Sequence, residues 1–191
     1  NEAINNFEYE GELLSWQPYG SGHINDTYLL VFRIGKMGTL KAILQRMNKE
    51  IFTNPEELME NVVGVTSYLR EKIAENGGDP DRETLNLIPA KDGKQYFVDS
   101  QGEYWRSYIF ITDATSYDQV EKPEDFYESA VAFGNFQRLL ADYPAGTLHE
   151  TIKGFHDTKA RFQVFKEAVE KDICGRAADV QKEIDFVLAH E

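Results

Sequence analysis

Residues 13–33 read LLSWQPYGSGHINDTYLLVFR, and this stretch decides the fold. Branched and aromatic residues fill positions 13–19 and 27–33, and a turn at residues 20–26 with two glycines separates them. Short runs of this kind, bounded by glycine, are typical of two antiparallel strands joined by a turn. The same composition predicts a third strand over residues 40–47.

A long helix is expected to follow, beginning at Pro55. Asn54 is a suitable N-cap, proline is favoured at the first helical position, and Glu56 and Glu57 favour the positive end of the helix dipole. Apolar residues then recur every three or four positions, at Leu58, Val62, Val65 and Leu69. This spacing predicts one buried face, and the glycines at residues 77–78 predict the end of the helix.

The second half of the chain begins with strands and ends with helices. Strands are expected over residues 85–90, 96–99 and 104–112, with a polar connector over 113–122 and helices over 123–142, 159–171 and 177–190. Runs of strands followed by runs of helices indicate an α+β fold.

Composition excludes several classes of protein. The chain has 191 residues, with 20 Lys and Arg against 33 Asp and Glu, and a formal net charge of −13. This balance argues against a nucleic-acid partner, whose phosphates need a basic surface, and against a polybasic membrane anchor. No apolar run approaches the roughly 18–20 residues of a membrane span. The single cysteine, Cys174, rules out an internal disulfide, and we expect a cytoplasmic protein.

The turn at residues 20–26 is the most informative segment for function. Gly20 and Gly22 leave the backbone free to approach phosphate oxygens, and Ser21, His23 and Asn25 add hydrogen-bond donors. The alternative is an ordinary hairpin turn. No Walker A motif occurs, so a P-loop fold is excluded. The order of elements follows the plan of a kinase small lobe: two strands joined by a glycine turn, then a third strand, then a long helix. The polar connector would be the hinge of this lobe.

Four segments, in this order, carry a resemblance to a known family. They are PYGSGHINDTY at residues 18–28, LQRMN at 44–48, NVVGVT at 61–66 and ETIKGFHDTKAR at 150–161. Together they resemble the phosphotransferase family of aminoglycoside and choline kinases, and more narrowly its N-acetylhexosamine 1-kinase branch. The resemblance implies ATP- and Mg²⁺-dependent transfer of a phosphoryl group to the anomeric hydroxyl of a sugar acceptor such as N-acetylglucosamine or N-acetylgalactosamine.

The resemblance also implies roles for particular residues in binding ATP. Gly20, Ser21 and Gly22 would cover the phosphates, as would the neighbouring turn residue Asn25. From the third strand, Gln45 or Arg46 would contact the phosphates, because alternation lets only one of the two face the cleft.

The adenine and sugar sides are assigned in the same way. Backbone groups from Phe110 to Thr112 would meet the adenine edge. His23 would reach toward the phosphates or the sugar, although a solvent-exposed loop histidine is the alternative. His156 and Asp157 would shape the sugar side, or Asp157 would simply cap its helix.

The sequence also departs from the family pattern. A usual member has lysine on the third strand, where this chain offers Gln45 and Arg46. The partner acid on the long helix would be Glu57 or Glu60, and either could equally be a solvated surface acid. The family's catalytic loop and metal-binding aspartate are absent; the one Asp-x-x-x-x-Asn match, at residues 81–86, lies in the small lobe and is rejected.

We therefore expect a kinase-like amino-terminal lobe over residues 1–112, a hinge over 113–122 and the beginning of a helical lobe over 123–191. The catalytic residues would lie in a missing carboxy-terminal lobe, and this chain alone would be inactive. The alternatives are a non-catalytic nucleotide-binding or interaction module, or a kinase of choline, homoserine or an aminoglycoside.

Overall fold

The computed structural model describes residues 2–36, 38–117 and 119–191. The chain forms two compact units, Asn1–Thr151 and Ile152–Glu191. This division lies beyond the expected hinge at residues 113–122, of which Asp118 is outside the described residues. Residues that follow the expected hinge stay with the first unit because they contact its long helix, as shown by the edge-on packing of Tyr143 against Tyr68.

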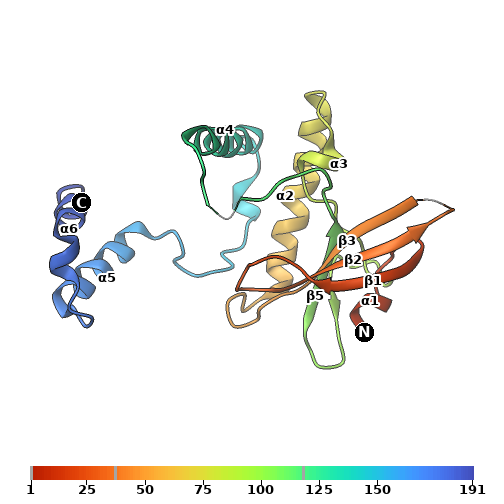
Figure 1. Ribbon diagram of the computed structural model, residues 1–191, viewed down its shortest axis with the longest axis horizontal. Helices are drawn as coiled ribbons and strands as arrows, with labels where there is room; N and C mark the ends of the chain where they lie inside the picture. Colours follow the sequence, from red (N-terminus) through yellow and green to blue (C-terminus); the bar gives the residue numbers. More distant parts are fainter. Residues whose placement is uncertain (1, 37, 118) are drawn as a thin grey trace. The chain divides into compact units, whose positions relative to one another are not determined.

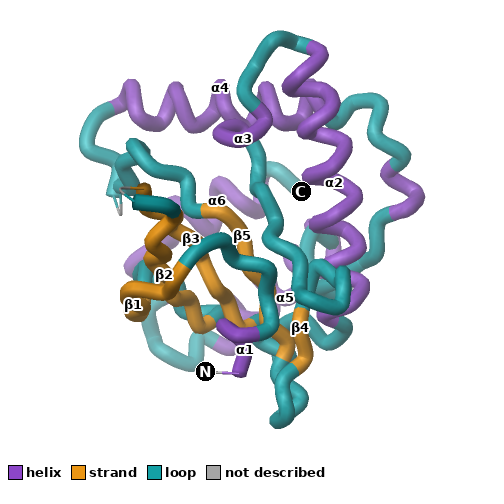
Figure 2. The backbone as a smooth tube through the Cα atoms, turned by 90° about the vertical axis from the view of Figure 1, so that its right-hand side faces the viewer, coloured by secondary structure: helices purple, strands orange, loops and turns teal. Residues whose placement is uncertain are grey.

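The first unit is built on a five-stranded antiparallel sheet in the order β1-β2-β3-β5-β4, drawn in Figures 1 and 2. Its strands are β1 (Glu12–Pro18), β2 (Asp26–Ile34), β3 (Gly38–Arg46), β4 (Phe97–Val98) and β5 (Tyr104–Ile109). The fold is therefore α+β, with β1, β2 and β3 close to the bounds expected from sequence. The final expected strand is shorter than predicted, because β5 ends at Ile109.

A glycine allows the chain to enter β1. Gly11 has φ +90°, and a Cβ atom at this position would lie 2.0 Å from the carbonyl oxygen of Arg33 on β2. Only glycine combines this backbone conformation with so close an approach. The β1–β2 register then shifts between Leu13 and Ser15, which is the mark of a bulge.

One face of the sheet packs on the core. Leu30, Ala42 and Leu44 are completely buried there, and the short helix α1 (Glu2–Asn5) covers them with Ala3 and Ile4. This helix was not expected from the sequence, because four residues are too short to show a period.

A chain of hydrogen bonds ties the amino-terminal segment to the sheet. The Tyr9 hydroxyl donates to Ser107 Oγ at 2.8 Å, and Ser107 Oγ donates to the carbonyl oxygen of Ile43 at 2.8 Å. Ser107 is fully buried, so its hydroxyl is satisfied by these two partners. Burial raises the pKa of Tyr9 above its usual range, while the hydrogen bond to Ser107 opposes this shift.

The long helix α2 (Pro55–Glu75) lies beside β5 in both views (Figures 1 and 2). Asn54 caps it as expected, because its side chain accepts a hydrogen bond from the N–H of Glu57. Its most buried apolar residues are Met59, Leu69 and Ile73. The expected face is therefore rotated slightly, since Leu58, Val62 and Val65 are only half-buried.

The expected strand over residues 85–90 is replaced by an extended segment with two isolated bridges. Leu87 pairs with Tyr108, and Ala90 pairs with Phe7. Pro89 lies between them and has no N–H to continue a ladder, which explains why no strand forms. A short helix, α3 (Pro80–Glu83), precedes this segment and was also not expected.

The last part of the first unit is joined to α2 by side-chain contacts. Asn61 donates to the carbonyl oxygen of His149 and accepts from its N–H, both at 2.9 Å, and His149 Nε2 lies 2.6 Å from a carboxylate oxygen of Glu60. The helix α4 (Pro123–Leu139) lies between α2 and His149 in the sequence. Several of its large apolar side chains are exposed, including Phe126 and Phe133.

The second unit consists of α5 (Thr158–Lys171), a 3₁₀ turn (Ala177–Val180) and α6 (Gln181–Ala189). Sequence predicted a single helix over residues 177–190, but its first turn is a 3₁₀ turn. Ile184 is the buried residue of α6. None of the described helices is both long and apolar enough to cross a membrane.

Candidate functional site

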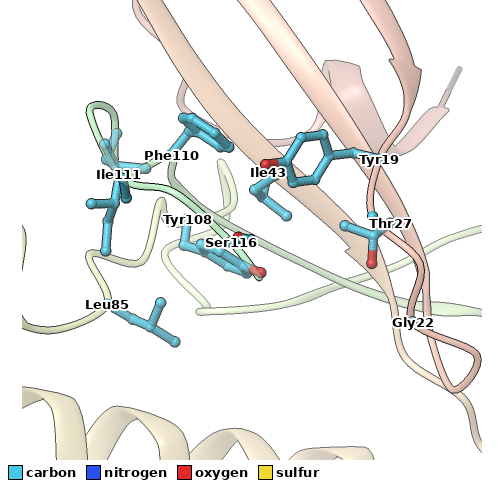
Figure 3. A pocket seen from close by; sticks show the side chains of 12 residues that line it. Tyr19, Gly22, Thr27, Ile43, Leu85, Tyr108, Phe110, Ile111 and Ser116 are labelled. Atoms are coloured by element: carbon cyan, nitrogen blue, oxygen red, sulfur yellow. The ribbon is translucent and has the colours of Figure 1, made fainter. Parts of the chain in front are cut away.

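A pocket of about 340 Å³ lies in the first unit, against the face of the sheet opposite α1. Its lining comes from four places: the glycine turn after β1, the strands β2, β3 and β5, the segment that follows β5, and the extended segment after α3. The residues are Tyr19, Gly20, Gly22, Thr27, Ile43, Leu85, Tyr108, Ile109, Phe110, Ile111, Ala114 and Ser116, whose side chains are drawn in Figure 3. A pocket of this volume is large enough for a small organic ligand.

Apolar and aromatic side chains form most of this lining. Ile43 is buried at its back, and Leu85 and Tyr108 lie together on one side (Figure 3). The ring of Tyr19 meets the ring of Phe110 edge-on, with their centroids 5.4 Å apart. This contact joins the glycine turn to the segment after β5, so that two segments distant in sequence close one side of the pocket.

A row of polar side chains crosses the three central strands on the pocket face. Thr27, Gln45 and Arg106 are direct neighbours in the β2–β3 and β3–β5 registers. Gln45 Nε2 donates to Thr27 Oγ1 at 2.9 Å, and Gln45 Oε1 accepts from Arg106 Nε at 2.9 Å and from Arg106 Nη2 at 2.7 Å. Thr27 lines the pocket, so the row begins at the pocket wall.

The alternation of β3 separates the two expected phosphate-binding residues. Gln45 shares a face with the pocket-lining Ile43, whereas Arg46 lies on the other face. Arg46 forms an ion pair with Asp26, and hydrogen bonding to this carboxylate raises the pKa of the guanidinium. Gln45 is therefore the one that the structure brings to the pocket side.

The glycine turn borders the pocket through its two glycines. Gly20 has φ +85°, a conformation that favours glycine, and neither Gly20 nor Gly22 has another atom within 4 Å of the position where a Cβ would lie. Ser21 is exposed beside them. Asn25 has a structural contact, because its Oδ1 accepts a hydrogen bond from the N–H of Asn48 after β3.

The segment after β5 presents backbone groups at the pocket. The N–H of Phe110 donates to the carbonyl oxygen of Lys41, and the carbonyl oxygen of Thr112 accepts from Arg82. Within the described part of the chain, the carbonyl oxygen of Phe110 and the N–H of Ile111 have no protein hydrogen-bond partner. An acceptor and a donor on neighbouring residues match the hydrogen-bonding edge of a nucleobase.

His23 lies at a different pocket from the one just described. A polar pocket of about 380 Å³ is lined by His23, Ile24, Asp26, Arg46, Asn48, Lys49, Glu50 and Glu103. The expectation that His23 reaches toward phosphates or a sugar therefore has no support from the lining of the pocket that contains Gly20 and Gly22.

His156 and Asp157 belong to the second unit. Asp157 caps α5, because its Oδ1 accepts from the N–H of Ala160 at 2.9 Å. The ring of His156 packs edge-on against Phe155. These contacts give Asp157 a structural role, which was the alternative stated for it from sequence.

Glu60, one of the two acids expected to pair with the third strand, has a different partner. Glu60 contacts His149. The neighbouring acid Glu56 forms a hydrogen bond with Tyr96; burial of Tyr96, together with this hydrogen bond, raises the pKa of Tyr96 to about 12. In residues 2–36, 38–117 and 119–191, no ion pair joins Glu57 or Glu60 to Arg46, and no hydrogen bond joins either acid to Gln45. The usual lysine–glutamate pair of a kinase small lobe has no counterpart among these residues.

Arg106 is the functional candidate that sequence reasoning missed. Its strand reads YWRSYI at residues 104–109, and alternation places Arg106 and Tyr108 on one face and the buried Trp105 and Ser107 on the other. The alternation puts this cation on the same face as Tyr108, but only the folded structure shows that Tyr108 lines a pocket. Burial lowers the pKa of Arg106 and raises the pKa of Tyr108 from their ordinary values.

Comparison with known protein families gives no assignment, since no family model matches this chain. Among the described residues, no group of three or more His, Cys, Asp or Glu side chains is placed to hold a metal ion. The residues lining the pocket are uncharged, so they do not fit a resident Mg²⁺ ion.

Proposed function

We propose that this chain provides the nucleotide-binding part of an ATP-dependent small-molecule kinase. One observation carries the proposal: one pocket is bounded by the glycine turn, by β3 and by the backbone of Phe110 and Ile111 after β5. These are the places where a kinase small lobe holds the phosphates and the adenine of ATP. The apolar residues between them supply surface for the base.

We assign the two parts of the pocket to two kinds of ligand group. Ile43, Leu85 and Tyr108 form an apolar surface suited to a flat heterocycle. The Phe110 carbonyl and the Ile111 N–H, which have no hydrogen-bond partner among the described residues, would bind its polar edge. The backbone at Gly20 and Gly22 is open to phosphate oxygens. Mg²⁺ would arrive with the nucleotide as MgATP, and we assign no metal ligand and no catalytic base to the pocket residues.

The acceptor is proposed from the sequence motifs. The four segments at residues 18–28, 44–48, 61–66 and 150–161 resemble sugar 1-kinases, so we propose an N-acetylhexosamine as the acceptor and its anomeric hydroxyl as the nucleophile. Choline, homoserine and aminoglycosides are the other acceptors of this chemistry to be tested.

A second candidate is a nucleotide-binding module without catalysis. The uncharged lining of the pocket favours it, because the lining includes no His, Asp, Glu or Lys, the usual general bases. The two candidates share nucleotide binding and differ in phosphoryl transfer.

The nucleotide proposal is tested by titrating the 191-residue chain with MgATP in a calorimeter. We expect saturable binding that Gly22→Val weakens at least about tenfold, because a branched side chain would hold phosphates away from the turn. Gly146→Val is the matched control, since Gly146 also has a negative φ and open space around it but does not line the pocket. A folded wild-type chain without affinity for MgATP would refute the proposal.

The acceptor proposal needs a separate assay with the complete protein. We expect release of ADP that depends on N-acetylglucosamine or N-acetylgalactosamine, with formation of the sugar 1-phosphate. No acceptor-dependent ADP release across hexosamines, choline, homoserine and aminoglycosides, together with retained ATP binding, would leave the non-catalytic candidate.

A further inference from the structure

Arg106 is an unneutralised cation on the pocket face of the sheet. Arg33, Arg46 and Arg70 each form an ion pair with a carboxylate. In contrast, within the described part of the chain no Asp or Glu oxygen lies within 4.0 Å of an Arg106 nitrogen. Among the described residues Arg82, Arg138, Arg161 and Arg176 also lack a carboxylate partner, but these four are exposed to solvent, whereas Arg106 is half-buried. A half-buried guanidinium without a carboxylate indicates that Arg106 is placed for an external anion.

The guanidinium of Arg106 is held in place by a neutral group. Gln45 Oε1 accepts from Arg106 Nε and Nη2, so the orientation of the guanidinium plane is set without cancelling its charge. Gln45 is itself oriented by its hydrogen bond to Thr27. A half-buried cation without a counter-charge is costly, and an anionic ligand would offset that cost.

One nitrogen of Arg106 remains available for a ligand. Within residues 2–36, 38–117 and 119–191, Nη1 donates to no protein atom, yet it is not among the buried polar atoms that lack a partner. It is therefore in contact with solvent on the same face as Tyr108, which lines the pocket.

We propose that Arg106, oriented by Gln45, binds the phosphate oxygens of the nucleotide in place of a lysine on β3; this inference rests on the proposed nucleotide-binding function. A planar guanidinium with a fixed orientation can donate to a phosphate oxygen while it keeps its bonds to Gln45. In this arrangement Gln45 is a positioning residue, and Arg106 is the residue that contacts the ligand.

Two variants test the role of Arg106. Arg106→Met retains most of the apolar stem and removes the charge. Gln45→Glu places a carboxylate on the guanidinium and neutralises it internally without loss of volume. Both are expected to weaken ATP binding at least about tenfold, because a hydrogen bond to a charged group is lost.

The ligands are chosen to separate phosphate from base. Calorimetric titrations with ATP, adenosine and inorganic tripolyphosphate are compared for wild type, both variants and Arg33→Met, an exposed arginine outside the pocket that serves as the charge control. We expect Arg106→Met and Gln45→Glu to lose affinity for ATP and tripolyphosphate and to retain the wild-type affinity for adenosine. Arg33→Met should match wild type with all three ligands. Circular dichroism and the urea midpoint establish that each variant is folded.

The outcomes distinguish this inference from the function on which it rests. If wild type binds ATP and both folded variants bind it equally well, the role of Arg106 is refuted and the nucleotide function stands. If wild type binds tripolyphosphate through Arg106 but neither adenosine nor ATP, the anion site stands and the nucleotide function is refuted. Absence of binding to all three ligands refutes both.

Discussion

The hydrogen-bonded chain from Tyr9 through Ser107 to Ile43 predicts a measurable coupling between the amino-terminal segment and the sheet. Ser107→Ala removes the acceptor of the Tyr9 hydroxyl and the side-chain donor to the Ile43 carbonyl oxygen, each at 2.8 Å. Leaving a buried polar group unpaired costs about 1–3 kcal/mol. Because Tyr9 is only half-buried, we expect Ser107→Ala to lower the free energy of unfolding by about 2–3 kcal/mol.

The second variant, Tyr9→Phe, removes the hydroxyl and leaves Ser107 free to donate to Ile43. It is expected to cost about 1 kcal/mol, the net value of one hydrogen bond. In the double variant no tyrosine hydroxyl is left without an acceptor, so its cost should be about 2 kcal/mol rather than the sum of the single costs. The predicted coupling between Tyr9 and Ser107 is therefore about 1–2 kcal/mol.

Urea unfolding followed by tryptophan fluorescence is the suitable assay. The two tryptophans, Trp16 on β1 and Trp105 on β5, both lie in the sheet, so the signal reports on the first unit and not on residues 152–191. Tyr117→Phe, which changes a tyrosine with 59% of its surface exposed, is the control and should change little. Additive costs of Tyr9→Phe and Ser107→Ala, within about 0.3 kcal/mol, would refute the reasoning.

Two further predictions concern the entry to β1 and the turn between β4 and β5. Gly11→Ala should lower the free energy of unfolding by more than about 3 kcal/mol, because it adds a clash with the carbonyl oxygen of Arg33 to the strain of positive φ. Gly102→Ala, where φ is +73° and the space around the glycine is open, should lower it by only about 1–2 kcal/mol. Equal urea midpoints for these two variants would contradict this prediction. Burial opposes ionisation of Asp99, but hydrogen bonds from the Trp105 indole and from two backbone N–H groups outweigh it and lower the pKa of the carboxyl. A carboxyl group with a lowered pKa stabilises the folded state at pH values above its unfolded pKa of about 4. The difference in unfolding free energy between wild type and Asp99→Asn should therefore shrink as the pH falls from 6 to 3. A difference that stays constant over this range in urea titrations would disprove the assignment.

Local patterns were sufficient to predict the central strands and the long helix. The bounds of β1, β2 and β3 follow from short branched runs between glycines, and the start of α2 follows from the Asn54 cap and Pro55. The segment at residues 85–90 was wrongly predicted as a strand, because the end of this segment pairs with the distant amino-terminal residues and not with β5. The carbonyl oxygen of Pro89 accepts from the N–H of Glu8, and Pro89 has no N–H to continue a ladder.

The candidate site could be predicted only in part. The two glycines of the turn were expected at the pocket because their role is local, and the choice between Gln45 and Arg46 needed only the alternation of β3. Arg106 could not be assigned from local pattern, since its position beside Gln45 depends on pairing between strands about sixty residues apart in sequence.

The contact between Asn61 and His149 has a consequence for motion within the first unit. The amide side chain of Asn61 binds both the N–H and the carbonyl oxygen of His149, as a neighbouring strand would. Because two hydrogen bonds must break together before the segment around His149 can separate from α2, any shift of the helix carries that segment with it. Displacements of α2 would therefore be transmitted along the chain as movements of residues 147–151, rather than being absorbed by a loose loop.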